Sequence, residues 1–406
     1  MRLRLVLAAL AASLAIPSAA AARAPGDVQV LALIPTPGYP ALPHILGGHI
    51  FEGTYDNPQG SSLRSRVLEY TGGGELLNSW TVLGQDVSKP HGVQVAANDA
   101  RGRLLLFDKT SGRIIRLDPQ TGAQTLYSTV PDLPTCSAAP AGAACSPESQ
   151  DMAPFPDYGA WGPDGSLYVT DYDQGVMFRF PPGGGTAQVW LSDPRLDGGM
   201  FGTACIVMMP DHHTLLFDQA SNGDAASGAT NPTTGKLYQV TIQANGKPGP
   251  LKQLWESGPA EAPDGCVLAR SGHIYIALVG TANQIVEVDA SGKELNRFGQ
   301  QFTGTNNSAV PFDSPSGLAY LGPDLIVANQ SYLAGNTANQ ALLNVETGEP
   351  GQPVFVPANA GLKPGSKPKP KKHKKHKHKH KHKRKHKRHK KKHHHHAAVG
   401  GLSLVG

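Results

Sequence analysis

Carboxylate, hydroxyl and imidazole side chains recur at the start of several similar segments of this 406-residue chain. Two segments contain the pair Pro-Asp with a glycine one or two residues further on, at Asp157 and Asp264. Corresponding places in the other segments are His91, Thr203, Ser316 and, in the first segment, Glu52 or Thr54. Oxygen donors suit a hard cation such as Ca²⁺ or Mg²⁺, and a carboxylate or imidazole can act as a general base. The alternative is that Pro-Asp-x-Gly is only a favourable turn, because Asp caps its own backbone and Gly accepts a positive φ.

The segments that carry these residues repeat one pattern of short strands and turns. Each has a Pro/Gly turn, a short apolar strand, a glycine-containing turn and a second strand, as in 156–169 and 263–276. Repeats of roughly 40–60 residues built from short strands are typical of a β-propeller. Six starts predict an all-β fold, a six-bladed β-propeller with four-stranded blades, over residues 42–358. Seven blades are the alternative, because the stretch 123–155 is long.

The propeller would bring the blade starts together. The first strand of each blade lines the central channel, so residues at its entry point into one end of that channel. We therefore expect Asp157 and Asp264 to lie near a common axial position.

Three stretches carry a resemblance to a known group of propellers: 161–171, 262–267 and 314–320. In them the chain resembles the family of senescence marker protein, gluconolactonase and luciferin-regenerating enzyme. The resemblance covers most of residues 42–350. It implies a six-bladed propeller with one divalent cation in its channel, Ca²⁺ first and Zn²⁺ or Mg²⁺ as alternatives. Some members hydrolyse sugar lactones or other cyclic esters.

The family's metal site is matched only in part. Asp264 matches the Asp of a Pro-Asp-Gly element, and Glu52 is the candidate for a Glu of the first blade. Where the family has an Asn opening a middle blade, alignment of the fourth and fifth starts places Thr203, a weaker ligand, and Asp157 could substitute. The resemblance thus implies a cation held by Glu52, Asp157, Thr203 and Asp264.

The implied mechanism has few parts. The cation would polarise a lactone carbonyl, and Asp264 or Asp157 would take a proton from the attacking water. His91 could serve instead as base or oxyanion donor, or it is a hydrogen-bonded turn histidine.

The N-terminus predicts export. A basic start and an apolar run from Leu5 to Ile16 precede an Ala-x-Ala-like cleavage site near Ala20 to Ala24. We predict a signal peptide over 1–24, a lead-in over 25–41 and a secreted protein, extracellular or associated with the cell envelope. An N-terminal membrane anchor is the alternative; no later stretch is long and apolar enough to cross a bilayer.

Export permits disulfides. Cys136 and Cys145 flank a loop rich in Ala, Gly and Pro, and a bridge between them is predicted. Cys205 and Cys266 fall at similar places in successive repeats. They are either bonded between neighbouring inner strands or two small buried apolar residues.

Residues 359–406 have the composition of a disordered Lys/His-rich tail. The stretch 363–392 holds 18 of the 37 Lys and Arg residues, which leaves 19 basic against 31 acidic residues elsewhere. We predict that the tail binds an anionic cell-surface polymer or another polyanion, and that its histidines bind transition metals weakly. No aromatic residues interleave the charges, so sequence-specific nucleic-acid binding is not expected. A merely solvated spacer is the alternative.

The favoured function is a metal-dependent hydrolase that acts, as a monomer, on a small lactone or ester. One alternative is a non-catalytic extracellular binding propeller held at anionic surfaces by its tail. The other is a propeller similar to strictosidine synthase, whose channel chemistry needs no cation.

Overall fold

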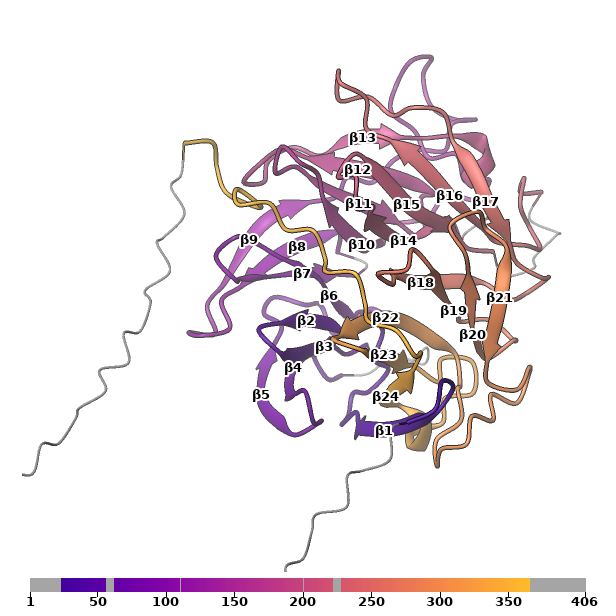
Figure 1. The fold of residues 1–406 in the computed structure, drawn as a ribbon. Coiled ribbons are helices and arrows are strands. Elements are labelled where there is room, and N and C mark those ends of the chain that lie inside the picture. The colour runs from indigo at the N-terminus through magenta and orange to yellow at the C-terminus, as the bar shows by residue number, and fades with distance from the viewer. Residues whose placement is uncertain (1–22, 56–61, 110, 200, 222–227, 366–406) are drawn as a thin grey trace, which may run out of the picture. The chain divides into compact units, whose positions relative to one another are not determined.

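Six four-stranded antiparallel sheets stand in a ring around a central channel (Figure 1). The computed structural model describes residues 23–55, 62–109, 111–199, 201–221 and 228–365. The predicted signal peptide, apart from Arg23 and Ala24, and most of the predicted tail lie outside the described residues. The predicted six-bladed β-propeller with four-stranded blades is confirmed, and the stretch 123–155 adds no seventh sheet in the described structure.

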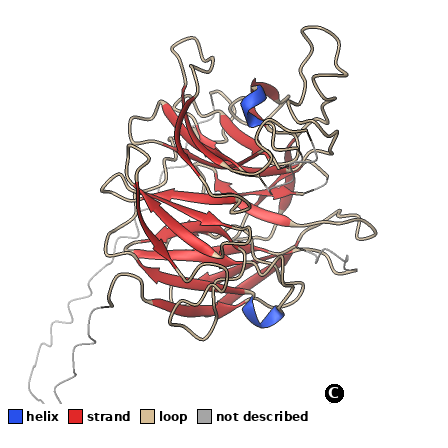
Figure 2. Ribbon diagram, turned by 90° about the vertical axis from the view of Figure 1, so that its right-hand side faces the viewer, coloured by secondary structure: helices blue, strands red, loops and turns tan. Residues whose placement is uncertain are grey.

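The strands of each blade are given from the channel outward. The first blade consists of β2 (His44–Leu46), β3 (His49–Gly53), β4 (Arg66–Thr71) and β5 (Leu76–Thr81). The second consists of β6 (Val93–Asn98), β7 (Leu104–Asp108), β8 (Arg113–Leu117) and β9 (Gln124–Thr129), and the third of β10 (Pro156–Trp161), β11 (Leu167–Asp171), β12 (Val176–Phe180) and β13 (Gln188–Leu191). The fourth and fifth blades consist of β14 (Thr203–Met208), β15 (Thr214–Gln219), β16 (Lys236–Thr241) and β17 (Lys252–Glu256); and β18 (Pro263–Leu268), β19 (Ile274–Leu278), β20 (Gln284–Val288) and β21 (Glu294–Phe298). Two short 3₁₀ turns, η1 (Pro194–Leu196) and η3 (Thr337–Asn339), are the helical segments of the described residues (Figure 2).

The sixth blade joins the two ends of the propeller. It consists of β22 (Pro315–Leu321), β23 (Asp324–Asn329), β24 (Ala341–Glu346) and, as its outer strand, β1 (Val28–Leu33). β1 belongs to the lead-in, and Val28 pairs with Val345. The lead-in thus closes the ring, because without β1 the edge of β24 would be exposed.

Apolar side chains between neighbouring sheets form the core. Every residue of β7, β11 and β19 is buried, because a second strand is covered by blades on both sides. The largest cluster packs Phe107, Trp161 and Phe217 from the second, third and fourth blades. The inner strands are thereby held in fixed register around the channel.

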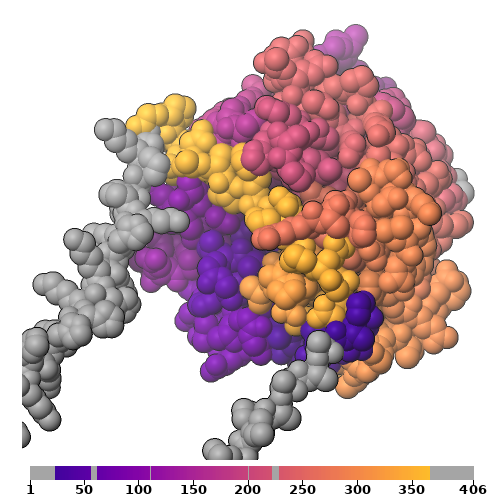
Figure 3. All heavy atoms as spheres, viewed as in Figure 1, coloured from indigo at the N-terminus to yellow at the C-terminus, as the bar shows by residue number. Residues whose placement is uncertain are grey.

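A strap formed by residues 347–365 crosses the face where the hairpin turns of the blades lie (Figure 3). Gly351 bridges to Ala269 of the fifth blade. The carbonyl of Ala360 accepts a hydrogen bond of 3.0 Å from the amide of Ala100 in the second blade. The other end of the channel, where the inner strands begin, carries the candidate site.

Both cysteine pairs are bonded. The predicted Cys136–Cys145 bridge is confirmed, with Cα atoms 4.8 Å apart. Cys205 on β14 is bonded to Cys266 on β18, so the second bridge links two neighbouring inner strands. In the described part of the chain, no helix has the length and hydropathy of a membrane span.

Candidate functional site

The register of the blades identifies one residue of each inner strand at the channel entrance. Pro156, Thr203, Pro263 and Pro315 pair with the last residue of the neighbouring second strand. The next residue points to the axis, and the same count applies in the second blade. In the first blade Ala41 is the equivalent residue, because its carbonyl oxygen lies against Gly317 as that of Ser316 lies against Gly265. We call these six residues the axial ring: Ala41, Gln94, Asp157, Ala204, Asp264 and Ser316.

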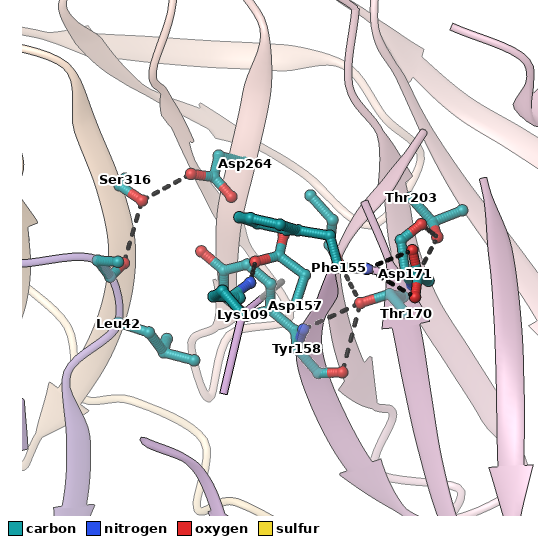
Figure 4. Close-up of polar contacts among 12 residues, drawn as sticks. Leu42, Lys109, Phe155, Asp157, Tyr158, Thr170, Asp171, Thr203, Asp264 and Ser316 are labelled. Atoms are coloured by element: carbon teal, nitrogen blue, oxygen red, sulfur yellow. Dashed lines mark hydrogen bonds and ion pairs between the residues drawn. The ribbon is translucent and has the colours of Figure 1, made fainter. Parts of the chain in front are cut away.

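Asp157 and Asp264 therefore lie together at the axis, as the sequence predicted (Figure 4). Both are buried, with 3% and 8% of their surface exposed. Burial and then the charge of Asp157 raise the pKa of Asp264 to about 7. Two acidic groups of one channel thus share a site from which water is largely excluded.

Asp264 is the start of a polar chain across three blades. Its Oδ2 accepts a hydrogen bond of 2.6 Å from the Ser316 hydroxyl, which also lies 3.0 Å from the carbonyl oxygen of Ala41. The strands approach closely here: a Cβ on Gly265 would lie 2.4 Å from the Ser316 carbonyl oxygen, and one on Gly317 would lie 2.3 Å from that of Ala41. The Ser316 hydroxyl has one hydrogen for these two acceptors, and its bond to Asp264 favours the ionised carboxylate.

Asp157 is paired with a lysine that the sequence analysis did not select. Lys109 follows β7, and its Nζ lies 2.5 Å from Asp157 Oδ1. The same Nζ lies 4.0 Å from the centre of the Phe155 ring. Burial raises the pKa of Asp157, and the Lys109 charge opposes that shift. Burial lowers the pKa of Lys109, while Asp157, Asp264 and Asp171 oppose the change.

Glu52 lies on the second strand of the first blade rather than in the axial ring. Its Oε1 accepts hydrogen bonds of 3.0–3.1 Å from the amides of Ala41, Leu42 and Gly53. Its Oε2 is buried with no hydrogen-bond partner. Burial raises its pKa from 4.5 to about 8, although the three amides act in the opposite direction. Glu52 thus fixes the entry of the first inner strand.

Thr203 does not reach the axis. Its hydroxyl lies 2.8 Å from the Val176 carbonyl oxygen and 3.1 Å from that of Asp171. The alignment that set Thr203 beside Asp264 is corrected by one residue, because the strand register makes Ala204 the equivalent of Asp264. The fourth blade thus contributes no side-chain donor to the axial ring.

His91 precedes the axial ring and is held by backbone carbonyls. Its Nδ1 lies 2.8 Å from the Lys89 carbonyl oxygen and its Nε2 2.7 Å from that of Leu63. With both ring nitrogens at carbonyl oxygens, the imidazole is placed to fix the loop before β6. This geometry favours the turn histidine over the catalytic base.

Aromatic rings form a row beside the axial carboxylates on the entrance side. We call Tyr55, Phe155, Tyr172 and Phe201 the aromatic row; successive ring centres lie 6.5, 6.0 and 5.4 Å apart. Asp171 holds the row in place, because its two oxygens accept hydrogen bonds of 3.1 Å from the Phe155 amide. Burial raises the pKa of Asp171 to about 6, and these contacts oppose the shift.

A hollow of about 140 Å³ opens beside Lys109 on the same side. It is lined by residues of the second blade and the loop before it: Gln85, Asp86, Lys89, His91, Asp108, Lys109 and Ser111. Of the residues at the channel entrance this hollow includes Lys109, and its lining contains no member of the axial ring or of the aromatic row.

The side-chain donors of this chain differ from those of the divalent-cation site that the resemblance implies. Among the described residues, two groups of three His, Cys, Asp or Glu donors lie within 4.8 Å of one another. One is Asp218 with the bonded Cys205 and Cys266. The other is His273, Glu287 and Glu349, and His273 lies in the turn between β18 and β19, at the end of β18 opposite Asp264. Neither contains the axial carboxylates, and Ala41 and Ala204 of the axial ring offer no side-chain ligand. The axial residues therefore fit the family's three-ligand cation site poorly.

Lys109 was missed because its sequence signal is a charged residue after a strand. The useful signal was internal: Phe107-Asp108-Lys109 corresponds to Thr170-Asp171-Tyr172 in the next blade. Comparison of the two triplets places Lys109 at the position in its blade that Tyr172, which faces the channel entrance, has in the next.

Comparisons with known proteins identify the fold. No protein-family model and no curated protein matches the chain. The calcium-binding protein regucalcin from Agrobacterium tumefaciens is 16% identical with a TM-score of 0.52, over 78% of this chain and 92% of that one. A luciferin-regenerating enzyme is 12% identical with a TM-score of 0.52, over 80% and 96% of the two chains. A putative gluconolactonase is 16% identical with a TM-score of 0.50, over 80% and 94%.

These similarities confirm the predicted resemblance at the level of the fold. The neighbours include the three kinds of propeller that the blade motifs resemble. At 12–16% identity the likeness defines the chain as a six-bladed propeller of this type and carries no residue-level function.

Proposed function

We propose that this propeller is a hydrolase of lactones or related cyclic esters and that it acts at the axial ring. The observation that carries the proposal is the meeting of Asp157 and Asp264, buried at one channel end beside one ammonium group and the aromatic row. Strongly shifted carboxyl groups in a partly closed site are typical of acid–base catalysis.

Asp264 is the proposed general base. Ionised Asp264 takes a proton from water while the water oxygen bonds to the acyl carbon of the ester. The tetrahedral oxyanion then collapses, the bond from the acyl carbon to the ring oxygen breaks, and Asp264 returns the proton to that oxygen. The product is an open hydroxy acid. A pKa near 7 suits both transfers at neutral pH.

The aromatic row defines the substrate class. Tyr55, Phe155 and Tyr172 offer a partly buried apolar surface next to the polar axial ring. A compact ring with one polar ester edge matches both surfaces.

The role of a divalent cation is supported unevenly. The resemblance and the calcium-binding regucalcin favour Ca²⁺, with Zn²⁺ or Mg²⁺ as alternatives, near Asp264. The donor set of this chain favours a site without one. The steps above are therefore assigned to Asp264 alone.

Hydrolysis of a panel of sugar lactones and simple γ- and δ-lactones tests the proposal. Asp264→Asn keeps the shape of the side chain and removes the base, so we expect kcat/KM to fall at least about 100-fold. Asp289→Asn, at an exposed turn of the fifth blade, is the matched control and should retain activity. Absence of hydrolysis by the unaltered chain, or full activity of Asp264→Asn, would refute the proposal.

A second function rests on the tail. With 18 Lys and Arg residues between 363 and 392, the tail is suited to hold the propeller at an anionic envelope polymer outside the cell. Export is supported by the two disulfides, which persist in oxidising compartments. Retention on an anionic resin at low salt should be lost when residues 363–406 are removed. Equal retention of both proteins would rule this function out.

A further inference from the structure

We infer that the ammonium group of Lys109 occupies the place of a metal cation in this channel, so that the axial site works with a built-in organic cation. Its presence there stands on geometry alone. Its part in hydrolysis rests on the proposed function.

The position of Lys109 is set by the backbone. Its amide donates a 3.0 Å hydrogen bond to the carbonyl oxygen of Gly92, just before β6. The same bond recurs in the third to sixth blades, where the donors are Tyr172, Ala220, Val279 and Gln330. Among these five equivalent positions only Lys109 carries a charge. The second blade thus supplies one cation to a ring of otherwise neutral positions.

The surroundings of the ammonium group are those of a bound cation. The Lys109 side chain is 1% exposed, and its Nζ contacts Asp157 Oδ1 at 2.5 Å. The face of Phe155 covers it at 4.0 Å, and the Tyr55 ring centre lies at 5.9 Å. Carboxylate oxygens on one side and ring faces on the other stabilise a desolvated cation.

The charges of the site support the same conclusion. Asp157, Asp264 and Asp171 all act electrostatically on Lys109. A divalent cation at Asp157 would lie close to the ammonium, and the repulsion between them would be strong in a buried site. The other axial-ring members are neutral. Binding of a metal therefore requires displacement of Lys109.

The built-in cation has a chemical use. An ammonium group has three N–H donors, and Asp157 occupies one of them. A second N–H can donate to the ester carbonyl oxygen as negative charge develops there, in a site where Phe155 excludes water. Lys109 would then stabilise the oxyanion while Asp264 moves the proton.

Thermal unfolding of the full chain with Ca²⁺ or Mg²⁺ tests the inference; these ions avoid the His-rich tail. The rise in Tm that the cation causes is measured in each protein with and without the further substitution Asp264→Asn. The difference between the two rises is the part that depends on Asp264. In the unaltered chain, which has Lys109, we expect no rise in Tm that depends on Asp264. In Lys109→Met the freed carboxylates should bind the cation and raise Tm by at least about 2 °C. Lys236→Met, which removes another mostly buried, ion-paired lysine, should show no such gain.

An Asp264-dependent rise in Tm of the unaltered chain would overturn the inference, and so would the absence of a rise in Lys109→Met. If Lys109→Met fails to fold, Lys109→Gln replaces it. If neither variant folds, the comparison of the unaltered chain with Asp264→Asn decides alone. Hydrolysis gives a separate readout, because a chelator should leave kcat/KM unchanged. Failure to hydrolyse any lactone would refute the proposed function and leave the Tm comparison valid.

Discussion

Glu52 and Asp218 occupy the same register position, the last but one residue of a second strand, in the first and fourth blades. These two blades stand opposite each other in the ring. Both side chains are fully buried, and Oε2 of Glu52 and both carboxylate oxygens of Asp218 lack hydrogen-bond partners. Burial, and then the charges of Asp264 and Asp157, raise the pKa of Asp218 well above its usual value. The propeller therefore carries buried acids that fold more easily with a proton than without one.

Glu52→Gln should change how stability depends on pH. Between pH 4.5 and about 8 folded Glu52 keeps a proton that the unfolded chain releases, so the free energy of unfolding falls as pH rises through this window. The amide cannot ionise, yet its oxygen can accept the same three backbone bonds. We expect the variant to be more stable than the unaltered chain at pH 8 by on the order of 4 kcal/mol, and similar at pH 4.5. Urea unfolding at both pH values checks this; a variant that is less stable at pH 8 would contradict it.

Ser316→Ala should shift the pH profile of hydrolysis. Asp264 must be ionised to act as a base, so kcat/KM should rise with pH and level off above about 7. The Ser316 hydroxyl lowers the pKa of Asp264, and its removal should move the midpoint of that rise to higher pH. A purely structural role would reduce stability and leave the midpoint in place. A midpoint that is unchanged or lower in the variant would count against the assigned role of Ser316.

The blades and the acidic pair were predictable because each is encoded locally. Turn residues and short apolar runs repeat along the chain, and Pro-Asp marks two of the six inner strands. Thr203 was aligned with Asp264, one residue off, because the fourth blade start has no Pro-Asp pair that fixes the alignment. The strand pairing makes Thr203 the equivalent of Pro263. The burial of Lys109 depends on Phe155 and Asp157, which lie in another blade. No local pattern reports such a contact.

Replacement of Cys205 and Cys266 by alanine should cost more stability than replacement of Cys136 and Cys145. The Cys205–Cys266 bridge closes a loop of 61 residues and the Cys136–Cys145 bridge a loop of 9. A longer loop gains more freedom in the unfolded chain when its bridge is lost. We expect about 4 kcal/mol for the first pair and about 2.5 kcal/mol for the second. Urea unfolding of the two double variants in non-reducing buffer measures the difference. Equal losses would show that the Cys205–Cys266 bridge adds little to the contacts between β14 and β18.

The contacts of Arg23 bear on where the predicted signal peptide would be removed. Its Nη2 donates hydrogen bonds of 2.7 Å to the carbonyl oxygens of Asp27 and Asn344, and its Nη1 donates one of 2.9 Å to Asn344 Oδ1. These bonds fasten β1 to β24 and help to close the ring. Cleavage after Ala22 preserves them, whereas cleavage after Ala24 removes them. We therefore expect the secreted protein to begin at Arg23, which intact mass and N-terminal sequencing will show. As a companion test, Arg23→Ala should lower the free energy of unfolding by about 1 kcal/mol. A mature chain that begins at Pro25 with undiminished stability would mean that Arg23 does not contribute to closure.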